Sequence, residues 1–584
     1  MTATSPQALT RPARQFIPEI LTLSAWADVS PFFDDLQIRP IESADDLRRW
    51  LLDRSELESY LSEDFAWRYI RSTCNTADEA LTRVLNFFIT DIQPQLAEIG
   101  NALDERTVAN PFLAKLTESA ANNGRGYAVM VRSMKKAIEI FREENIPILT
   151  DLQTEERRYG AIVGSMTVSI LGHEMTLPQA ADRLLLPDRA ARQEAWRKIQ
   201  ARRFQDSQVL DSLFDTLVTL RHQVAMNAGF ANFRDYSFAA LGRFDYTPAD
   251  CFLFHEAVAE AVVPMLTELA ADRKHRLGVS ELRPWDTSVD PDNLPPLKPF
   301  STGAELLEKT IVCFDRLSPT LGNYLRIMRA MGHFDLESRK AKAPGGYNYP
   351  LEEIGAPFIF MNATSSLRDL VTMVHEGGHA VHSFQTRELP VKAFRNPPME
   401  VAELASMAME LLSMEHWDVF FENPADLRRA KIQHLEQIIE TLPWIATIDK
   451  FQHWIYENPA HSHAQRREAW VQIYDQFTDT LTDWSSLAYY KEIGWQRQLH
   501  LFEVPFYYIE YGIAQLGAIG IWRNYRQNPE AGLQGYLNAL SLGYQAPIGD
   551  IYRAANVPFD FSKETIRELI GFVWNEWVFL HHEN

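Results

Sequence analysis

The chain has 584 residues, of which 46% are hydrophobic, and its formal net charge is −21. The hydrophobic content supports a sizeable folded core. The acidic balance argues against a nucleic-acid partner, because nucleic acids are bound by basic patches. No stretch approaches the roughly 20 apolar residues that a membrane-spanning helix needs, so no membrane partner is expected.

The N-terminal sequence and the cysteines indicate the compartment. The first residues lack a positively charged region followed by an apolar one, so no signal peptide is expected. Cys74, Cys251 and Cys313 are scattered and show no C-x-x-C spacing. An odd number of isolated cysteines predicts a reduced, cytoplasmic chain in which each cysteine is a small core residue.

Taken in chain order, the sequence predicts a mainly α-helical protein. A first helical region covers residues 1–110. Helical spacing with few breakers then defines four long helical stretches, 77–107, 111–145, 187–228 and 248–277. Residues 160–175 predict a β-hairpin with Gly172 near its turn. The proline-rich stretch 284–299 predicts a loop or a crossing connection.

The most informative motif is His-Glu-Gly-Gly-His at residues 375–379. Ser366 and Asp369 form a capping box, which predicts that a helix starts just before the motif. On that helix His375 and His379 lie about one turn apart on one face, so both imidazoles can reach one metal ion. Glu376 lies beside them, where it can act on a metal-bound water. This is the H-E-x-x-H signature of zinc hydrolases.

Gly378 belongs to the opposite, core-facing stripe of the same helix. A glycine in a helix interior costs about 1 kcal/mol relative to alanine. Close approach by another backbone is the expected reason for tolerating it. His382 also lies beside the metal face. It is expected to support a ligand or to be solvated, since a fourth protein ligand would close the site to water.

A carboxylate on a downstream helix is expected to complete the metal site. Residues 399–412 are apolar on nearly all sides of a helix, which predicts burial. A buried carboxylate needs a partner or a metal. We predict Glu403 as the third ligand and Glu410 as support for a ligand histidine. Glu400 is the rival ligand, and the alternative is a half-exposed helix whose glutamates face water.

Two other histidine-containing segments could carry chemistry. His461 and His463 follow Asn458-Pro459 and are expected to lie on the surface. Residues 500–511 offer the imidazole of His500 together with three tyrosine hydroxyls. Such groups can donate hydrogen bonds to a developing oxyanion. On pattern alone, an aromatic-rich helix of this kind is more often part of a core.

Together these motifs resemble the M3 family of zinc oligopeptidases, most closely the bacterial oligoendopeptidase F type. The resemblance rests on the His-Glu-Gly-Gly-His motif and on Ala402–Ser406, where Glu403 follows His379 by 24 residues. It runs from about residue 110 to the end. Further segments similar to family motifs are Leu282–Asp286, Lys342–Tyr347, Pro357–Asn362, Tyr536–Leu540 and Ala546-Pro547.

The resemblance implies a fold of two helical lobes around a deep substrate channel, with a small β-sheet beside the active site. It divides the chain after residue 110 into an oligoendopeptidase F-type region, 111–205, and a catalytic region, 206–584. It implies one Zn²⁺ per chain, and it matches His375, His379 and Glu403 to the ligands and Glu376 to the catalytic base. The remaining matched residues would stabilise the oxyanion: His500, Tyr507 and Tyr511, with Tyr508 as a possible substitute.

The expected function is internal cleavage of short peptides by a zinc metalloendopeptidase. The peptide is expected to add as a strand to the edge formed by Pro357–Asn362. Substrate contacts are expected from Gly345, Gly346, Tyr347, Phe358 and Phe360. Two alternatives remain open: a carboxypeptidase-like relative, in which a basic residue near the zinc would hold the substrate's C-terminus, and a non-catalytic helical scaffold with a structural zinc.

Overall fold

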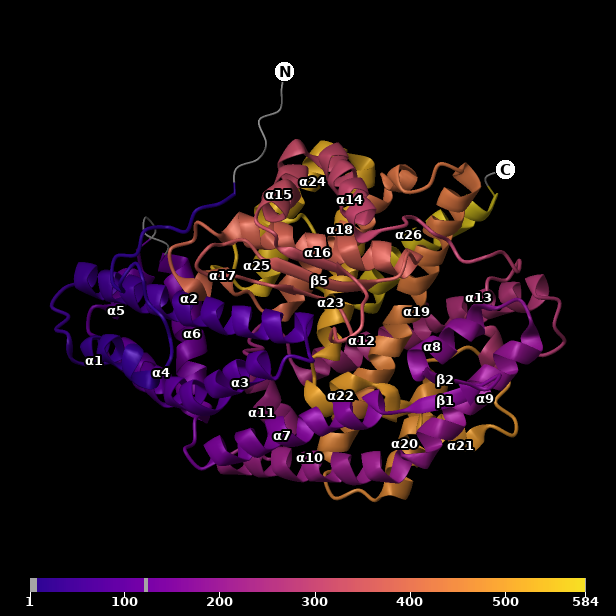
Figure 1. Ribbon diagram of the computed structural model, residues 1–584, viewed down its shortest axis with the longest axis horizontal. Coiled ribbons are helices and arrows are strands. Elements are labelled where there is room, and N and C mark those ends of the chain that lie inside the picture. Colours follow the sequence, from indigo (N-terminus) through magenta and orange to yellow (C-terminus); the bar gives the residue numbers. More distant parts are fainter. Residues whose placement is uncertain (1–7, 120–123, 583–584) are drawn as a thin grey trace. The chain divides into compact units, whose positions relative to one another are not determined.

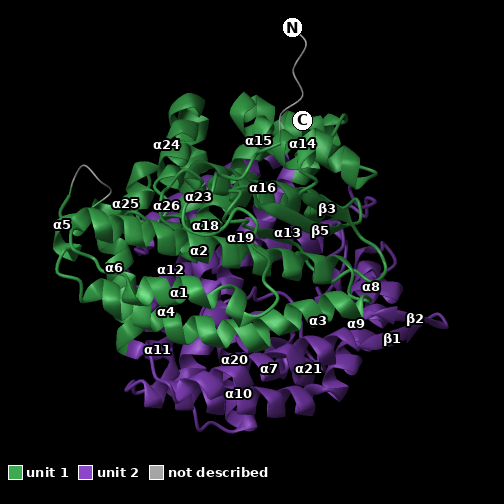
Figure 2. Cartoon of the chain, turned by 60° about the vertical axis from the view of Figure 1, so that its left-hand side comes forward, with its two compact units in different colours: residues 1–139, 298–430, 517–559 green, residues 140–297, 431–516, 560–584 purple. Residues whose placement is uncertain are grey.

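The computed structural model describes residues 8–119 and 124–582, and most of them lie in helices (Figure 1). The prediction of a mainly α fold is therefore confirmed. The chain forms two compact units, each assembled from three separate segments (Figure 2). Unit 1 contains residues 1–139, 298–430 and 517–559, and unit 2 contains residues 140–297, 431–516 and 560–584.

Unit 1 holds the small mixed sheet and the helix that carries the His-Glu-Gly-Gly-His motif. Its elements are α1 (Ser30–Ile38), α2 (Ala44–Cys74), α3 (Glu79–Phe87), α4 (Gln93–Val108), α5 (Leu113–Thr117), α6 (Gly124–Ile140), α14 (Gly303–Leu317), α15 (Pro319–Ala330), β3 (Phe334–Glu337), β4 (Tyr347–Tyr349), β5 (Phe358–Ala363), α16 (Leu367–Thr386), α17 (Lys392–Arg395), α18 (Met399–Met414), α24 (Pro529–Ser541) and α25 (Ile548–Ala554).

Unit 2 is helical apart from one hairpin. Its elements are α7 (Asn145–Gly164), β1 (Thr167–Ile170), β2 (His173–Thr176), α8 (Leu177–Ala181), α9 (Arg189–Gln205), α10 (Ser207–Asn227), α11 (Phe233–Ala240), α12 (Pro248–Ala261), α13 (Val263–Arg276), α20 (His463–Gln476), α21 (Ala488–Glu492), α22 (Leu499–Glu503) and α26 (Lys563–His582). Two helices continue from one unit into the other along the chain, α19 (Pro424–Glu457) and α23 (Tyr508–Gln527).

The predicted long helices are broken at identifiable positions. The stretch 248–277 forms α12 and α13, because Pro264 lies in the first turn of α13 and lacks the N–H that a continuous helix would need. The stretch 187–228 forms α9 and α10. In the stretch 77–107, α3 and α4 are joined by one π-helical turn, Phe88–Ile92. The stretch 111–145 forms α5 and α6, which are separate helices, and its residues 120–123 lie outside the described residues.

The predicted hairpin is present but shorter than expected. Helix α7 continues to Gly164, so β1 starts only at Thr167. The strands pair antiparallel, with Ile170 opposite His173. Leu171 and Gly172 form the turn with φ values of 54° and 78°, the left-handed conformation that a two-residue hairpin turn requires.

The three-stranded sheet of unit 1 corrects one prediction. Its strand order is β3-β5-β4, so β5 is the central strand. Ile359 lies opposite Phe334 of the parallel strand β3 and opposite Asn348 of the antiparallel strand β4. The prediction that residues 357–362 form an edge open to a peptide is therefore wrong, because both sides of β5 are already paired. Its unbroken apolar run is typical of such a buried strand.

The same sheet packs against α2. Phe358 and Phe360 are 5% and 0% exposed, and they share a core cluster with Ala66 and Ile70 of α2. The ring of Tyr347 stacks on that of Phe360, with centroids 4.7 Å apart. These aromatic side chains hold the sheet to the helix.

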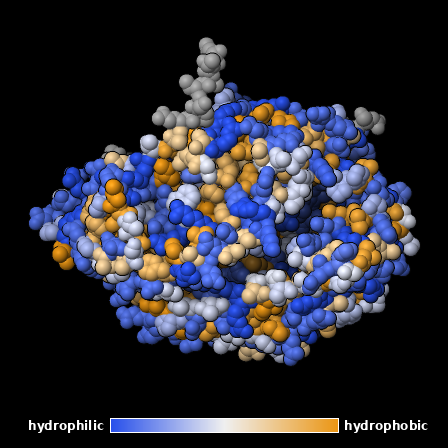
Figure 3. Space-filling model, in the orientation of Figure 1, coloured by the Kyte–Doolittle hydropathy of each residue, from blue (hydrophilic) through white to orange (hydrophobic). Residues whose placement is uncertain are grey.

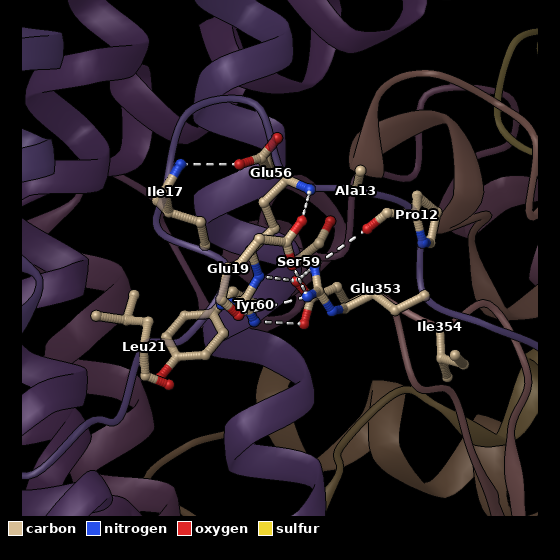
Figure 4. A network of polar contacts seen from close by, with 12 residues as sticks. Pro12, Ala13, Ile17, Glu19, Leu21, Glu56, Ser59, Tyr60, Glu353 and Ile354 are labelled. Carbon is tan, nitrogen blue, oxygen red and sulfur yellow. Dashed lines mark hydrogen bonds and ion pairs between the residues drawn. The ribbon is translucent and has the colours of Figure 1, made fainter.

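An extended N-terminal segment is fastened to unit 1 by a polar network (Figure 4). The Glu56 carboxylate on α2 accepts hydrogen bonds from the backbone N–H groups of Gln15, Phe16 and Ile17, at 2.8–2.9 Å. The Arg14 Nη2 donates to the Glu353 carboxylate at 2.8 Å. Residues 353 and 354 lie just before β5, so the network joins this segment to the loop that leads into the sheet.

Within the described part of the chain, every helix is too short or too polar to cross a bilayer. Hydrophobic and hydrophilic residues are interspersed on the face drawn in Figure 3.

Candidate metal centre

Helix α16 begins as the sequence predicts. Ser366 is its N-cap: the Ser366 hydroxyl accepts a hydrogen bond from the Asp369 N–H at 3.2 Å, and the Asp369 carboxylate accepts one from the Ser366 N–H at 2.9 Å. This reciprocal pair satisfies N–H groups that the first helical turn leaves open. The helix that follows brings the rings of His375 and His379 to a centroid separation of 5.0 Å.

The two glycines of the motif allow close packing of α16. A Cβ on Gly378 would lie 2.5 Å from the Ala405 carbonyl oxygen and 2.6 Å from the Ser406 Cα. The backbone of α18 therefore touches α16 at this point, as predicted. A Cβ on Gly377 would lie 2.7 Å from the ring of Phe314 in α14. The contact at Gly378 sets α18 at a depth that brings Glu403 next to the histidine pair.

His375, His379 and Glu403 converge in unit 1. The Glu403 Oε2 lies 3.4 Å from the His375 Nε2 and 3.8 Å from the His379 Nε2. Atoms bound tetrahedrally to one zinc at about 2.1 Å lie roughly 3.4 Å from one another, so these separations fit a shared zinc ion. The Ser406 hydroxyl donates to the same carboxylate oxygen at 3.1 Å and helps to orient it.

Glu410 contacts the first histidine from the other side. The His375 Nδ1 and the Glu410 Oε1 are 2.7 Å apart. This contact turns the Nε2 of His375 toward Glu403. Burial disfavours a charged imidazole, but hydrogen bonds with Glu403 and Glu410 and their negative charges raise the pKa of His375 well above its ordinary value. Burial lowers the pKa of His379 to about 4, so its imidazole is neutral at physiological pH. The group as a whole offers an excess of negative charge to a cation.

Glu376 is buried beside the pair. Glu376 is 6% exposed, and burial raises the pKa of its carboxyl group to about 7. A carboxyl group with such a pKa can both accept and return a proton near neutral pH. The Glu376 carbonyl accepts a hydrogen bond from the Asn348 amide at 3.0 Å, which ties α16 to strand β4. The sequence pattern held no signal for Asn348 beyond its place after Tyr347.

The other candidate ligands lie outside this group. Among the described residues, Glu403 is the carboxylate that groups with the two histidines, and the rival Glu400 is not in that group. The backbone carbonyl of Glu400 accepts a hydrogen bond from the Tyr552 hydroxyl. His382 is buried, and burial lowers its pKa to about 3. His461 contacts the Asn458 carbonyl, and His463 pairs with Asp215 at 2.6 Å, so the structure gives these two histidines separate partners.

A cavity of about 380 Å³ lies directly beside His379. Its wall includes His382 and Ser383 from α16 and Asn348 from β4. Two arginines also line it, Arg387 and Arg395. Arg395 pairs with Glu352 at 3.1 Å, and Arg387 approaches the exposed Glu388 at 3.6 Å. Neither arginine lies in a recognisable motif, so the sequence pattern held no signal for either.

The predicted loop before β4 contains a turn that favours glycine. Gly345 has a φ of 96°, which only glycine adopts readily, and a Cβ on Gly346 would lie 3.3 Å from the Phe360 carbonyl oxygen. The hydroxyl groups of Tyr347 and Thr73 are 2.6 Å apart. The Tyr347 side chain is therefore held by α2 and by the sheet.

The predicted oxyanion residues gather in unit 2. The ring centroid of His500 lies 5.9 Å from those of Tyr507 and Tyr511, and 4.9 Å from that of Tyr508. The His500 Nδ1 lies 2.7 Å from the Gln498 amide nitrogen, which fixes the ring. Because this group belongs to unit 2 and the three candidate ligands to unit 1, its approach to the metal stays a prediction.

Comparison with known proteins shows the family to which the chain belongs. A family model described as peptidase family M3 matches residues 184–570, and one described as the peptidase M3 N-terminal domain matches residues 25–124. An oligoendopeptidase F homolog of Lactococcus lactis subsp. lactis (strain IL1403) is 23% identical over 312 residues, 52% of this chain and 51% of that protein. The oligopeptidase PepF of Bacillus subtilis (strain 168) is 26% identical over 230 residues, 38% of this chain and 33% of that protein.

These alignments span about half the length of the curated relatives or less. A solved structure of PZ peptidase A with an inhibitor is similar along the whole chain: the TM-score is 0.88 at 26% identity, with 98% of this chain and 100% of that chain covered. The M3 family model alone matches more than half of the sequence, and the residues that it spans include both histidines and Glu403. The chain therefore belongs to peptidase family M3.

Proposed function

We propose that the protein is a zinc-dependent oligopeptidase that hydrolyses internal bonds of short peptides. The observation that carries this proposal is the convergence of His375, His379 and Glu403 on two helices held together at Gly378. Family membership supports the same reading. Two imidazole nitrogens and one carboxylate oxygen, with a supporting carboxylate behind one histidine, are typical of catalytic zinc sites.

Five residues of unit 1 carry the proposed chemistry. His375, His379 and Glu403 would hold the zinc ion, and Glu410 fixes the ring of His375. A bound zinc ion supplies Lewis-acid activation of water and of the scissile carbonyl. Glu376 accepts the proton of the attacking water and delivers it to the leaving amine, for which a pKa of about 7 is well matched.

The oxyanion that forms at the scissile carbonyl needs hydrogen-bond donors. His500, Tyr507 and Tyr511 provide an imidazole N–H and two phenolic O–H groups, clustered in unit 2. Donors of this kind contribute most when they are fixed before the reaction. The contact of His500 with Gln498 and the packing of the rings supply that rigidity.

Strand β4 is the edge at which we place the peptide. It pairs with β5 on one side only, it directly follows Gly345 and Gly346, and its Asn348 reaches the carbonyl of Glu376. Addition of the substrate as a further strand would use backbone hydrogen bonds and so tolerate many sequences. The cavity beside His379 would then receive a substrate side chain or end group.

Replacement of Glu376 by glutamine tests the proposal. The Glu376→Gln chain should keep its bound zinc and lose roughly 10²–10⁴-fold in kcat, measured with an internally quenched peptide. Glu388→Gln is the matched control, since Glu388 follows the same helix and its side chain is 86% exposed. A Glu376→Gln chain that retains most of its turnover would remove the residue from this role.

Arg387 and Arg395 favour a second candidate, a carboxypeptidase-like activity. A guanidinium in the cavity beside His379 could pair with a substrate's terminal carboxylate. Digestion of one peptide as the free acid and as the C-terminal amide separates the two activities. An endopeptidase yields the same internal fragments from both, whereas a carboxypeptidase acts on the free acid alone and loses activity in Arg387→Met. A zinc-loaded chain inactive on both peptides would indicate a scaffold.

A further inference from the structure

Unit 2 contains a second group of metal-binding side chains, unrelated to the His-Glu-Gly-Gly-His motif. Helix α12 contributes Cys251 and His255, and α19 contributes Asp449 and His453. Both pairs have the spacing i, i+4, so each pair leaves one face of its helix. All four residues are at most 2% exposed.

The distances within the group are short. His255 Nε2 lies 2.8 Å from Asp449 Oδ2, and His453 Nε2 lies 3.3 Å from the same oxygen. One donor atom each from Cys251, Asp449 and His453 lie within 4.8 Å of one another. A single ion could therefore contact a sulfur, an oxygen and a nitrogen without rearrangement of either helix.

Protein contacts leave this group incompletely satisfied. Asp449 Oδ1, His255 Nδ1 and His453 Nδ1 are buried and have no hydrogen-bond partner among the described residues. Buried polar atoms of this kind are destabilising unless something pairs with them. Burial alone would raise the pKa of Asp449. The neighbouring His453 and His255 outweigh burial and hold this pKa below its ordinary value, so the carboxylate is charged.

Aromatic side chains pack around this group. The rings of Phe252 and Phe506 lie 4.8 Å and 5.3 Å from that of His453. Burial lowers the pKa of His255, although Asp449 opposes the change, so this imidazole is mainly neutral. A buried anion within an apolar shell calls for a positive charge at close range.

We propose that Cys251, Asp449 and His453 form a second metal site for Zn²⁺, with His255 orienting the carboxylate. A thiolate, an imidazole and one carboxylate suit zinc, whereas Mg²⁺ and Ca²⁺ prefer sites made of oxygen atoms alone. Complete burial excludes a substrate, so the ion would be structural and would join α12 to α19. This inference does not depend on the proposed function.

The site would also support the loop that carries Tyr507. The Phe506 N–H donates to the side-chain oxygen of Gln452, which neighbours His453 in α19. Phe506 has a φ of 66°, a conformation that a side-chain-bearing residue adopts only when its surroundings enforce it. An ion that fixes this turn of α19 would help to hold the Phe506 backbone in place.

Cobalt substitution tests the site directly. The metal-free full-length chain is titrated with Co²⁺ and followed by near-ultraviolet absorption, where a cobalt–thiolate bond gives a charge-transfer band. The candidate centre in unit 1 has no sulfur ligand, so it cannot contribute to that band. We expect a band whose final intensity corresponds to one thiolate-bound Co²⁺ per chain, that persists in His375→Ala and disappears in Cys251→Ser.

Cys313→Ser and Cys74→Ser are the matched controls, because neither cysteine belongs to the group, and both should keep the band. The zinc content of the purified chain should be two per molecule in the wild type and one in Cys251→Ser. A wild-type chain that binds a single Co²⁺ without a thiolate band would overturn the proposal, and this measurement requires no variant to fold. A band retained in Cys251→Ser would overturn it equally.

Discussion

Replacing Gly378 by alanine tests whether close packing of two helices sets the geometry of the candidate metal centre. The new Cβ would lie 2.5 Å from the Ala405 carbonyl oxygen, 2.6 Å from the Ser406 Cα and 2.9 Å from the Met409 Cβ. None of these atoms can move away by a side-chain rotation. The backbone of α18 must therefore shift, and Glu403 moves with it.

The size of the effect follows from these contacts. Ordinary contact begins at 3.4 Å, so the helices must separate by roughly 0.9 Å at this point. Overpacking of a core typically costs about 1–3 kcal/mol. Alanine offsets about 1 kcal/mol of that cost through its higher helix propensity. We expect a net loss of about 0–2 kcal/mol in unfolding free energy, together with weaker metal binding, because Glu403 recedes from both imidazoles.

The assay compares denaturant unfolding of the metal-free chain with zinc affinity measured by chelator competition. Gly100→Ala is the matched control. Gly100 lies inside helix α4 of the same unit and has nothing within 4 Å of an added Cβ, so alanine should stabilise there by up to about 1 kcal/mol. If Gly378→Ala matched Gly100→Ala in both measurements, the close contact would have no bearing on the site.

Three further predictions concern single side chains. Glu410→Ala should weaken zinc binding by roughly 10–100-fold in chelator competition, and an unchanged affinity would contradict its supporting role. Tyr507→Phe should lower kcat more than it raises KM in steady-state assays, whereas the opposite pattern would make Tyr507 a binding residue. Burial raises the pKa of Asp335, but hydrogen bonds from Arg339 and Lys342 lower it to about 2. A carboxyl group with a lowered pKa in the folded chain stabilises the fold above its ordinary pKa of about 4. Asp335→Asn should therefore lower the unfolding free energy by at most about 2 kcal/mol at pH 7, and this difference should fade as pH falls towards 2. A loss of stability that persists at pH 2 would contradict this explanation.

The local features of unit 1 could be predicted from the sequence because short-range rules determine them. A capping box and a four-residue spacing suffice to start α16 and to align His375 with His379. The close contact at Gly378 could also be predicted, because glycine destabilises a helix interior and is expected there only where another backbone packs closely. Pro264 signals the break after α12, because a proline cannot continue a helix. Helical spacing of apolar residues on both sides of Pro264 nevertheless suggested one long stretch.

Features that depend on distant partners were harder to predict. An apolar run such as Phe358–Met361 fits a strand, but only the pairing of β3 and β4 decides that it lies in the centre of the sheet. The arginines of the cavity beside His379 come from segments without any motif. The Cys251 and Asp449 group was invisible for the same reason, since its halves are almost 200 residues apart in the chain.

The interleaving of the two units bears on how the chain is made in the cell. Unit 1 needs residues up to 559 and unit 2 needs residues beyond 559, so neither can close before residue 559 has left the ribosome. Segments synthesised early keep their apolar faces exposed until the later segments emerge. Contacts between residues far apart in the sequence also form slowly. Nascent chains of this protein should therefore depend on chaperones, and truncation at either unit's apparent boundary should yield aggregates.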